Sequence, residues 1–284
     1  MNGKADVRPA LARVLHATDL TADGDLAFVH SLKLALAVRG ELVVVHADPD
    51  RRRAGGAWDA FPGVRETLTR WSLLPSGAEA GAVGEALGLH VRKVDIPDKD
   101  PMSAVLDLVD HRPVDLVVLA SHARNGLDRW LHPSFAEPLA RGARLPTLFL
   151  PHGARGFIAP ETGAQRLRHV LVPVDQAPRA GRALALAMDM ADAIGASDAV
   201  FHLLHVGTHW PAIPIPGGRE SRVRQLERKG AVVDEIVSAA DQLDADLIVM
   251  ATHGHDGLLD ALRGSTTEQV LRRAKRALLA VPAT

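Results

Sequence analysis

The chain has 284 residues, of which 47% are hydrophobic and 24% are charged, so wholesale disorder is excluded and two folded domains are predicted. Lys and Arg number 33 against 34 Asp and Glu, and the net charge of −1 argues against a general nucleic-acid binder. No apolar run is long enough for a membrane span, the first residues do not resemble a secretion signal, and there is no cysteine. Disulfides, thiolate metal sites and cysteine nucleophiles are therefore excluded, and a cytoplasmic location is expected.

The first half of the chain alternates short apolar runs with helical patterns. Leu26–Val38 has apolar residues at spacings of three and four, which predicts a helix. The segment Asp48–Gly88 is rich in Gly and Pro but contains a predicted helix at Val64–Leu74. The apolar runs are typical of strands buried on both faces, as in a parallel sheet covered by helices. These predicted strands are Arg13–Thr18, Leu42–His46, Val114–Ala120 and Thr147–Leu150.

The second half repeats this alternation over a shorter length. A helix is predicted at Arg182–Ile194, whereas Gly207–Ser221 contains several prolines and is predicted to be a loop beside the carboxyl edge of the sheet. The predicted strands of this half are His169–Val174, Ala199–Val206, Leu247–Ala251 and Leu278–Val281.

The two halves are related by an internal repeat. Pro113–Pro151 aligns with Asp244–Pro282 without a gap and with fourteen identical positions, and Leu15–Asp19 aligns with Leu171–Asp175. The stretch between these shared parts is shorter in the second copy, which has therefore lost most of one element. We expect an α/β protein of two tandem Rossmann-like, doubly wound domains with parallel five-stranded sheets, at residues 1–152 and 166–284, the second shortened. Gly153–Gln165 is predicted to be the linker between them.

The second half has two groups of residues suited to a ligand at the carboxyl edge of its sheet. Asp175 ends the first strand, where a carboxylate can accept a hydrogen bond from an adenine amino group or a ribose hydroxyl; a helix N-cap is the alternative. Further on, Ala-Thr-His-Gly at 251–254 is followed after nine residues by Gly-Ser-Thr at 264–266, which opens the last helix. Small residues before a helix N-terminus let backbone N–H groups approach phosphate oxygens, although ordinary turn and cap chemistry also uses them.

These residues resemble the nucleotide loop of the universal stress proteins, whose ATP-binding pattern is Gly-x2-Gly-x9-Gly-(Ser/Thr). The strand ends Pro-x-Asp at 173–175 and Leu-Leu-His-Val at 203–206 also match that family, and the resemblance covers nearly the whole chain as a tandem pair. It implies the adenine-nucleotide-hydrolase type of fold and an ATP-binding stress-response sensor or adaptor, with ATP bound with or without Mg²⁺. The resemblance implies that Pro173, Val174, Asp175 and Val206 surround the adenine and ribose. The residues implied at or near the phosphates are Ala251, Thr252, Gly254, His255, Gly264, Ser265 and Thr266.

Two departures distinguish this chain from the family pattern. Ala251 stands where the first glycine of the motif is expected, and its methyl group narrows the approach to a phosphate. In the first half, Ala120, Ala123 and Pro133 replace all three glycines, although Ser134 remains. Proline has no N–H to offer. We therefore expect the first half to bind nucleotide weakly or not at all and to act as a structural partner.

The resemblance also implies how the halves associate. The fifth strand pairs across the dimer in family members, so Leu145–Leu150 and Arg276–Val281 are expected to pair within this chain and form an intramolecular pseudo-dimer. A further homodimer, through a two-fold interface, is an open alternative. Protein partners are expected for an adaptor, but nothing in the sequence identifies them.

Other functions remain as alternatives. A module of the same fold could bind a lipid, a metabolite or a metal, with the apolar, proline-rich loop Gly207–Gly218 as its binding surface. His205, His209, His253 and His255 could converge on a metal, but the sequence has no close pair of metal ligands on a helix, and no metal is expected. There is also no P-loop lysine, so no catalytic residue is assigned and any ATP hydrolysis is expected to be slow.

Overall fold

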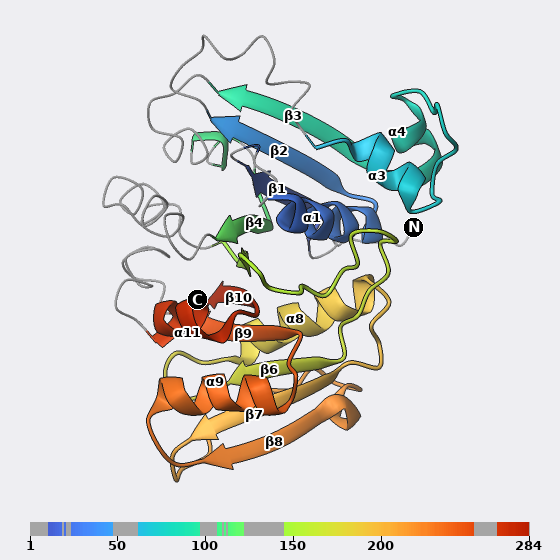
Figure 1. Cartoon of the computed structure of the whole chain (residues 1–284). Helices are drawn as coiled ribbons and strands as arrows, with labels where there is room; N and C mark the ends of the chain where they lie inside the picture. Colours follow the sequence, from blue (N-terminus) through green and yellow to red (C-terminus); the bar gives the residue numbers. More distant parts are fainter. Residues whose placement is uncertain are drawn as a thin grey trace, which may run out of the picture.

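In the computed structural model, strands from both halves of the chain form one ten-stranded sheet (Figure 1). The structure describes residues 11–18, 20, 24–47, 62–96, 107–109, 111, 113–121, 145–252 and 266–283. The strand order is β3-β2-β1-β4-β5-β10-β9-β6-β7-β8. Each half therefore repeats the order 3-2-1-4-5 of a doubly wound fold, and the two halves meet at their last strands. In the part of the chain that the structure describes, no helix is long and apolar enough to cross a membrane.

The elements of the first half follow the predicted alternation, with two additions. Its five strands are β1 (Arg13–Ala17), β2 (Glu41–Ala47), β3 (His90–Ile96), β4 (Leu116–Ser121) and β5 (Thr147–Pro151). Its helices with described bounds are α1 (Asp25–Ala37), α3 (Val64–Arg70) and α4 (Ala82–Leu87). Strand β3 and helix α4 have no continuous apolar run and were not predicted. Helix α3 is shorter than expected because Ser72, just beyond it, has a φ of 60°.

The second half has the same five strands but no α-helix between its second and third strands. The strands are β6 (His169–Pro173), β7 (Val200–Val206), β8 (Val223–Arg228), β9 (Leu247–Thr252) and β10 (Ala277–Pro282). The helices are α8 (Gly181–Ala193), α9 (Val232–Gln242) and α11 (Thr266–Ala274), with a single 3₁₀ turn, η3 (Glu220–Arg222). Between β7 and β8 no α-helix forms in residues 207–222, all of which are described. The expected shortening is therefore the loss of the helices that correspond to α3 and α4.

The halves are joined by an antiparallel pair of strands, β5 and β10. Leu278 lies opposite Phe149 and Ala280 lies opposite Thr147, whereas every other strand pair in the sheet is parallel. This pairing confirms the expected intramolecular contact between the last strands. Because each strand covers the other's exposed edge, neither half ends in an unpaired strand at this position.

Helices cover both faces of the sheet. Helices α1 and α8 contact each other and pack on one face, where a single apolar cluster includes Leu32 of α1, Leu184 of α8 and Val170 of β6. The other face carries α9 and α11, which contribute Ile236 and Leu271 to a second cluster. Since the first cluster crosses from one half to the other, the halves share a core in addition to their paired strands.

The segment predicted to be a linker is packed rather than exposed. Phe157 and Ile158 are buried, and both of their backbone N–H groups donate to Nε2 of His30 on α1, at 2.9 and 3.1 Å. Further along, Trp71 donates from Nε1 to the carbonyl of Pro160 at 2.9 Å. The segment thus has no regular helix or strand pattern because it is held by contacts with distant residues of the first half.

Two aspartates that are identical in the repeat lie at the amino edge of the sheet. Asp246 accepts hydrogen bonds from the backbone N–H groups of Arg168 and His169 at 2.7 and 3.0 Å, and Arg155 adds an ion pair at 2.8 Å. In the first half Asp115 accepts from the backbone N–H of Arg13 at 2.7 Å. Both carboxylates hold the start of a first strand, so their repetition reflects folding and not the chemistry of a ligand site.

The loop after β7 occupies space near α8. Trp210, Ile213 and Ile215 pack against the apolar cluster of the α8 face, and Pro214 contacts Gly181 so closely that a Cβ there would lie 2.7 Å from its ring. These side chains contact the protein's own core. The hypothesis that Gly207–Gly218 is a binding surface stays an alternative, although part of the loop's apolar surface packs on the core.

Candidate functional site

A cavity of about 330 Å³ opens at the carboxyl ends of β6, β7 and β9, between helices α9 and α11. Parallel doubly wound sheets bind their ligands at this edge, where the strand order reverses. The cavity brings together every predicted site residue that the structure describes. These residues are Pro173, Val174, Asp175, Val206, Ala251, Thr252 and Thr266. The other four, Gly254, His255, Gly264 and Ser265, lie outside the described residues.

Apolar side chains that the sequence analysis did not name form much of the wall. Leu204 and Met250 come from β7 and β9, and Ile236 comes from α9. Val232, also in the lining, is the first residue of α9 and is 45% exposed. Leu204 and Met250 could have been predicted, because they lie in predicted strands close to the named site residues. The contribution of α9 could not, because it depends on how this helix packs on the sheet.

A buried hydroxyl in the wall has no hydrogen-bond partner among the described residues. Thr252 ends β9 with 4% of its surface exposed, and its Oγ1 contacts no donor or acceptor among the described residues. A buried polar group without a partner costs about 1–3 kcal/mol. A ligand that bonds to this hydroxyl would recover that free energy, so Thr252 is the strongest single indication of a ligand in this cavity.

Asp175 does not cap a helix. Helix α8 begins at Gly181, its N-cap residue is Ala180, and no side chain bonds to its first turn. The alternative role predicted for Asp175 is therefore wrong. The carboxylate is exposed at the cavity, where its Oδ1 accepts from the backbone N–H of the adjacent Gln176 at 2.7 Å. The outward oxygen atoms can accept hydrogen bonds from a ligand hydroxyl or amine.

The base of the cavity is held by a histidine that recurs in both halves. His205 Nδ1 lies 3.1 Å from the carbonyl of Val174, and because a carbonyl only accepts, this nitrogen carries the proton. In the first half His46 Nδ1 makes the same bond, at 2.9 Å, to the carbonyl of Thr18. The ring of His205 also contacts Trp210 edge-on, with centroids 5.8 Å apart. His205 therefore positions the strand end that carries the site residues.

The described histidines do not form a metal site. No group of three or more His, Asp or Glu side chains gathers in the part of the chain that the structure covers, and His209 Nδ1 bonds to the hydroxyl of Thr208 at 2.9 Å. His253 and His255 lie outside the described residues. Of the four histidines considered as metal ligands, the two that can be placed thus bond to protein groups.

The N-terminus of α11 borders the cavity, as expected for the last helix. Thr266 and Thr267 form its first turn and line the wall. The free N–H groups and the dipole at a helix N-terminus favour negative charge. The cavity thus combines apolar walls, a carboxylate, threonine hydroxyls from β9 and α11, and an electropositive helix end. This arrangement suits a ligand with a flat apolar part and an anionic part.

Less of the corresponding edge of the first half is described. Thr18 Oγ1 accepts from the backbone N–H of Leu20 at 3.0 Å, so this hydroxyl already has a partner. Ala120 is the next-to-last residue of β4, at the position equivalent to Ala251 of β9. Asp19, Ala123, Pro133 and Ser134 lie outside the described residues.

Comparisons with known proteins agree on one family. The model of the "Universal stress protein family" matches residues 11–151 and 215–282. A relative described as universal stress protein A homolog 1, from Coxiella burnetii, is 29% identical over an alignment 141 residues long, which covers 40% of this chain and 95% of that protein.

Solved structures with the same fold cover almost the whole chain. A universal stress protein from Archaeoglobus fulgidus is similar with a TM-score of 0.61 and 18% identity, covering 95% of this chain and 96% of that one. A protein of unknown function from Pseudomonas aeruginosa PAO1 is similar with a TM-score of 0.59 and 17% identity, covering 96% and 93%. At such low identity these likenesses concern the fold.

Proposed function

The chain belongs to the universal stress protein family, and from that premise we propose that its second half binds an adenine nucleotide, ATP in the first instance, and that the protein acts as a nucleotide-responsive sensor or adaptor. One observation carries the proposal. The cavity at the ends of β6, β7 and β9 is lined by all seven described residues expected to contact nucleotide, and one of them, Thr252, has a buried hydroxyl without a described partner.

The proposed roles follow from the chemistry of the wall. Pro173, Val174 and Val206 supply apolar surface for the adenine ring, and Asp175 accepts a hydrogen bond from the base or the ribose. Thr252 and the first turn of α11 lie on the side suited to phosphates. Gly254, Gly264 and Ser265 are proposed to complete that side, as in the family pattern.

A resident metal is not part of the proposal. No cluster of three potential metal ligands lies among them. Mg²⁺ often binds through one or two carboxylates and substrate phosphates. If Mg²⁺ accompanies ATP here, we expect it to be held mainly by the phosphates; Asp175 is the one carboxylate in the described wall.

Isothermal titration calorimetry with ATP tests the proposal on the full chain. We expect a Kd below about 1 mM. Ala251→Leu places a larger side chain in the cavity and should weaken binding at least about tenfold. Ala120→Leu makes the same change at the equivalent position of the first half and serves as the matched control. No heat at any ATP concentration would favour a lipid, metabolite or metal as the ligand, and equal losses in both variants would contradict binding in the second half alone.

Slow hydrolysis of ATP is a separate outcome that a phosphate-release assay measures. The absence of a P-loop lysine predicts little stabilisation of charge on the γ-phosphate. We therefore expect release close to the buffer rate in both the wild type and Asp175→Ala. Turnover that the substitution abolishes would identify an enzyme instead of a sensor.

A further inference from the structure

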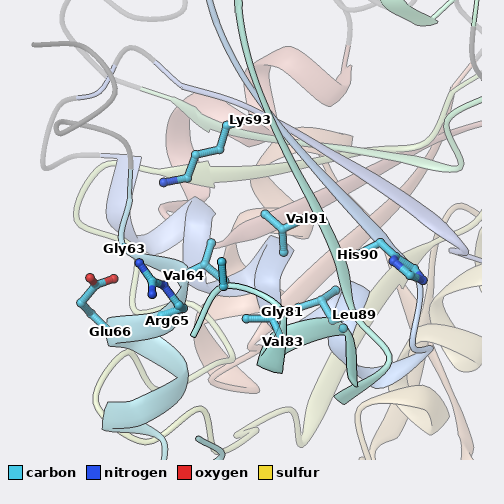
Figure 2. Close-up of a pocket in the computed structure, with 12 residues that line it drawn as sticks. Gly63, Val64, Arg65, Glu66, Gly81, Val83, Leu89, His90, Val91 and Lys93 are labelled. Atoms are coloured by element: carbon cyan, nitrogen blue, oxygen red, sulfur yellow. The ribbon is translucent and has the colours of Figure 1, made fainter. Parts of the chain in front are cut away.

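A second and larger cavity, of about 710 Å³, lies in the first half on the helix pair that the second half lacks (Figure 2). It opens between α3, α4 and β3, beside the edge strand of the first half. It is therefore separate from the proposed nucleotide cavity, which lies at the carboxyl ends of β6, β7 and β9. Ligand pockets in proteins have volumes of about 300–1,000 Å³. The size of this cavity is thus in the range of a small organic molecule.

The inner wall of this α3–α4 cavity is apolar. Val83 of α4 and Leu89, just before β3, are buried members of the core, and Val91 of β3 packs against it. In Figure 2 the side chains of Val83 and Val91 both face the open space. This surface can hold the apolar part of a ligand but cannot bind its polar groups.

Two glycines keep the cavity open. A Cβ built on Gly84 would meet only the carbonyl oxygen of Leu89, at 4.0 Å, and one built on Gly81 would meet only the flexible side chain of Glu85, at 3.4 Å or more. Neither glycine has a positive φ. Larger residues could therefore fit at both positions without straining the fold, so the space is not imposed by packing.

The outer wall carries an excess of positive charge. Among the described lining residues, Arg65 of α3 and Lys93 of β3 are the cationic side chains, and Glu66 has the one carboxylate. Arg65 Nη1 donates to the carbonyl of Ala78 at 3.0 Å, which fixes the guanidinium at the rim. Figure 2 shows the ammonium of Lys93 directed toward the α3 side of the cavity, whereas the ring of His90 points away from it.

The half-buried position of Lys93 makes its charge sensitive to a partner. Burial lowers the pKa of its ammonium from 10.5, Glu66 raises it, and the like charge of Arg65 lowers it again. An anion between the two cations would offset both the burial and the repulsion.

We propose that the α3–α4 cavity is a second ligand site, which binds small organic anions through a carboxylate or phosphate at Arg65 and Lys93 and an apolar body on Val83, Leu89 and Val91. The site is independent of the proposed nucleotide site. It would give the first half a ligand of its own, although that half has lost the glycines of the nucleotide loop.

Four probes with one alkyl chain test the charge requirement: octanoate, octyl phosphate, octanol and octylammonium. Binding is followed through the backbone amide NMR signals of Gly81 and Val91. We expect saturable shifts with octanoate or octyl phosphate, and their relative affinities distinguish a carboxylate ligand from a phosphate ligand. Octylammonium should not bind. Equal affinity for octylammonium, or no saturable shift with either anion, would overturn the proposal.

Substitutions then locate the site. Lys93→Gln and Arg65→Gln should each weaken anion binding at least about fivefold. Arg70→Gln, at the far end of α3 and outside the lining, should have no effect. Ala251→Leu, which fills the nucleotide cavity, should also leave anion binding unchanged. If it does not, the anions bind at the other site and the inference fails, whatever the result with ATP.

A filled cavity gives the sharpest test. Gly84→Leu should abolish anion binding, and because glycine inside a helix is unfavourable, its thermal midpoint should equal or exceed that of the wild type. Anion binding that persists in folded Gly84→Leu would overturn the proposal. Should this variant fail to fold, the Lys93→Gln and Arg70→Gln comparison decides alone.

Discussion

The imidazole of His30 ties the connector to the first half of the chain, because its Nε2 accepts the backbone N–H of Phe157 at 2.9 Å. Its Nδ1–H donates to the carbonyl of Leu26 at 2.7 Å, and the ring of Phe157 meets it edge-on with centroids 4.5 Å apart. Both ring nitrogens are therefore used by a neutral histidine. A proton added at Nε2 would remove the acceptor that holds the connector.

This geometry predicts a stability that depends on pH. Burial lowers the pKa of His30 from 6.5 to about 4. Between these two values the unfolded chain binds more protons than the folded chain, so the free energy of unfolding falls as pH drops from 6.5 toward 4. The shift corresponds to a loss of about 3 kcal/mol.

Urea denaturation at pH 7 and at pH 4.5 measures this effect. His30→Gln removes the titrating group and should flatten the dependence, although it lowers stability at pH 7. The exposed His90→Gln is the control and should retain the wild-type dependence. Parallel pH profiles for the wild type and His30→Gln would show that another group is responsible.

The Thr252 hydroxyl predicts opposite effects on stability and binding. Thr252→Val removes a buried polar atom that has no described partner, so the protein without ligand should be as stable as the wild type or more stable by about 1 kcal/mol. If the hydroxyl bonds to nucleotide, ATP affinity should fall about tenfold in calorimetry, equivalent to about 1.4 kcal/mol. Unchanged affinity would remove Thr252 from the proposed site.

Gly163 in the connector predicts a large cost for a small substitution. Its φ is 68°, and a Cβ there would lie 2.5 Å from the indole of Trp71. Gly195 has a similar φ of 82° but open space around it. Gly195→Ala should therefore cost about 1–2 kcal/mol from the backbone alone, and Gly163→Ala should cost more because the indole must move. Denaturant midpoints compare the stability of the two variants. Equal losses of stability would mean that the connector and Trp71 move apart at little cost in free energy.

Arg222 predicts how strongly the loop after β7 is held. Its guanidinium donates to the carbonyls of Ala196 and Ala199, pairs with Asp192 and lies 5.1 Å from the ring centroid of Phe201. Arg222→Ala leaves the two carbonyls without this donor and should cost about 2–3 kcal/mol. The exposed Arg224→Ala is the control. In Arg222→Ala, amide hydrogen exchange should be faster in residues 207–222 than in the wild type. Unchanged protection there would show that Arg222 does not hold the loop.

The repeated parts of the chain were the most predictable. Strands with apolar residues on both faces, such as β4 and β9, and the strand ends that carry Asp175 and Ala251 were placed correctly from the sequence. The edge strands β3 and β8 were missed because each is paired on one side only and carries charged residues, as in the Val-Arg-Gln-Leu-Glu-Arg of 223–228.

The remaining gaps concern contacts between distant segments. Nothing local distinguishes His30 from other helical residues, yet its two acceptor contacts come from Phe157 and Ile158, far along the chain. In the site, Ile236 and Val232 line the cavity only because α9 packs against β6 and β7. Periodicity reports which face of an element is buried, but it does not report which element covers that face.

The antiparallel pairing of β5 with β10 has a consequence for how the two halves could diverge. Because one polypeptide carries both strands, dilution cannot separate the two halves, and the β5–β10 interface does not have to discriminate against other proteins. Each half therefore always pairs with the other half of the same chain. The amino-terminal lobe could therefore lose ligand-binding features without creating mismatched assemblies, and specialisation of one lobe would leave the other's scaffold intact.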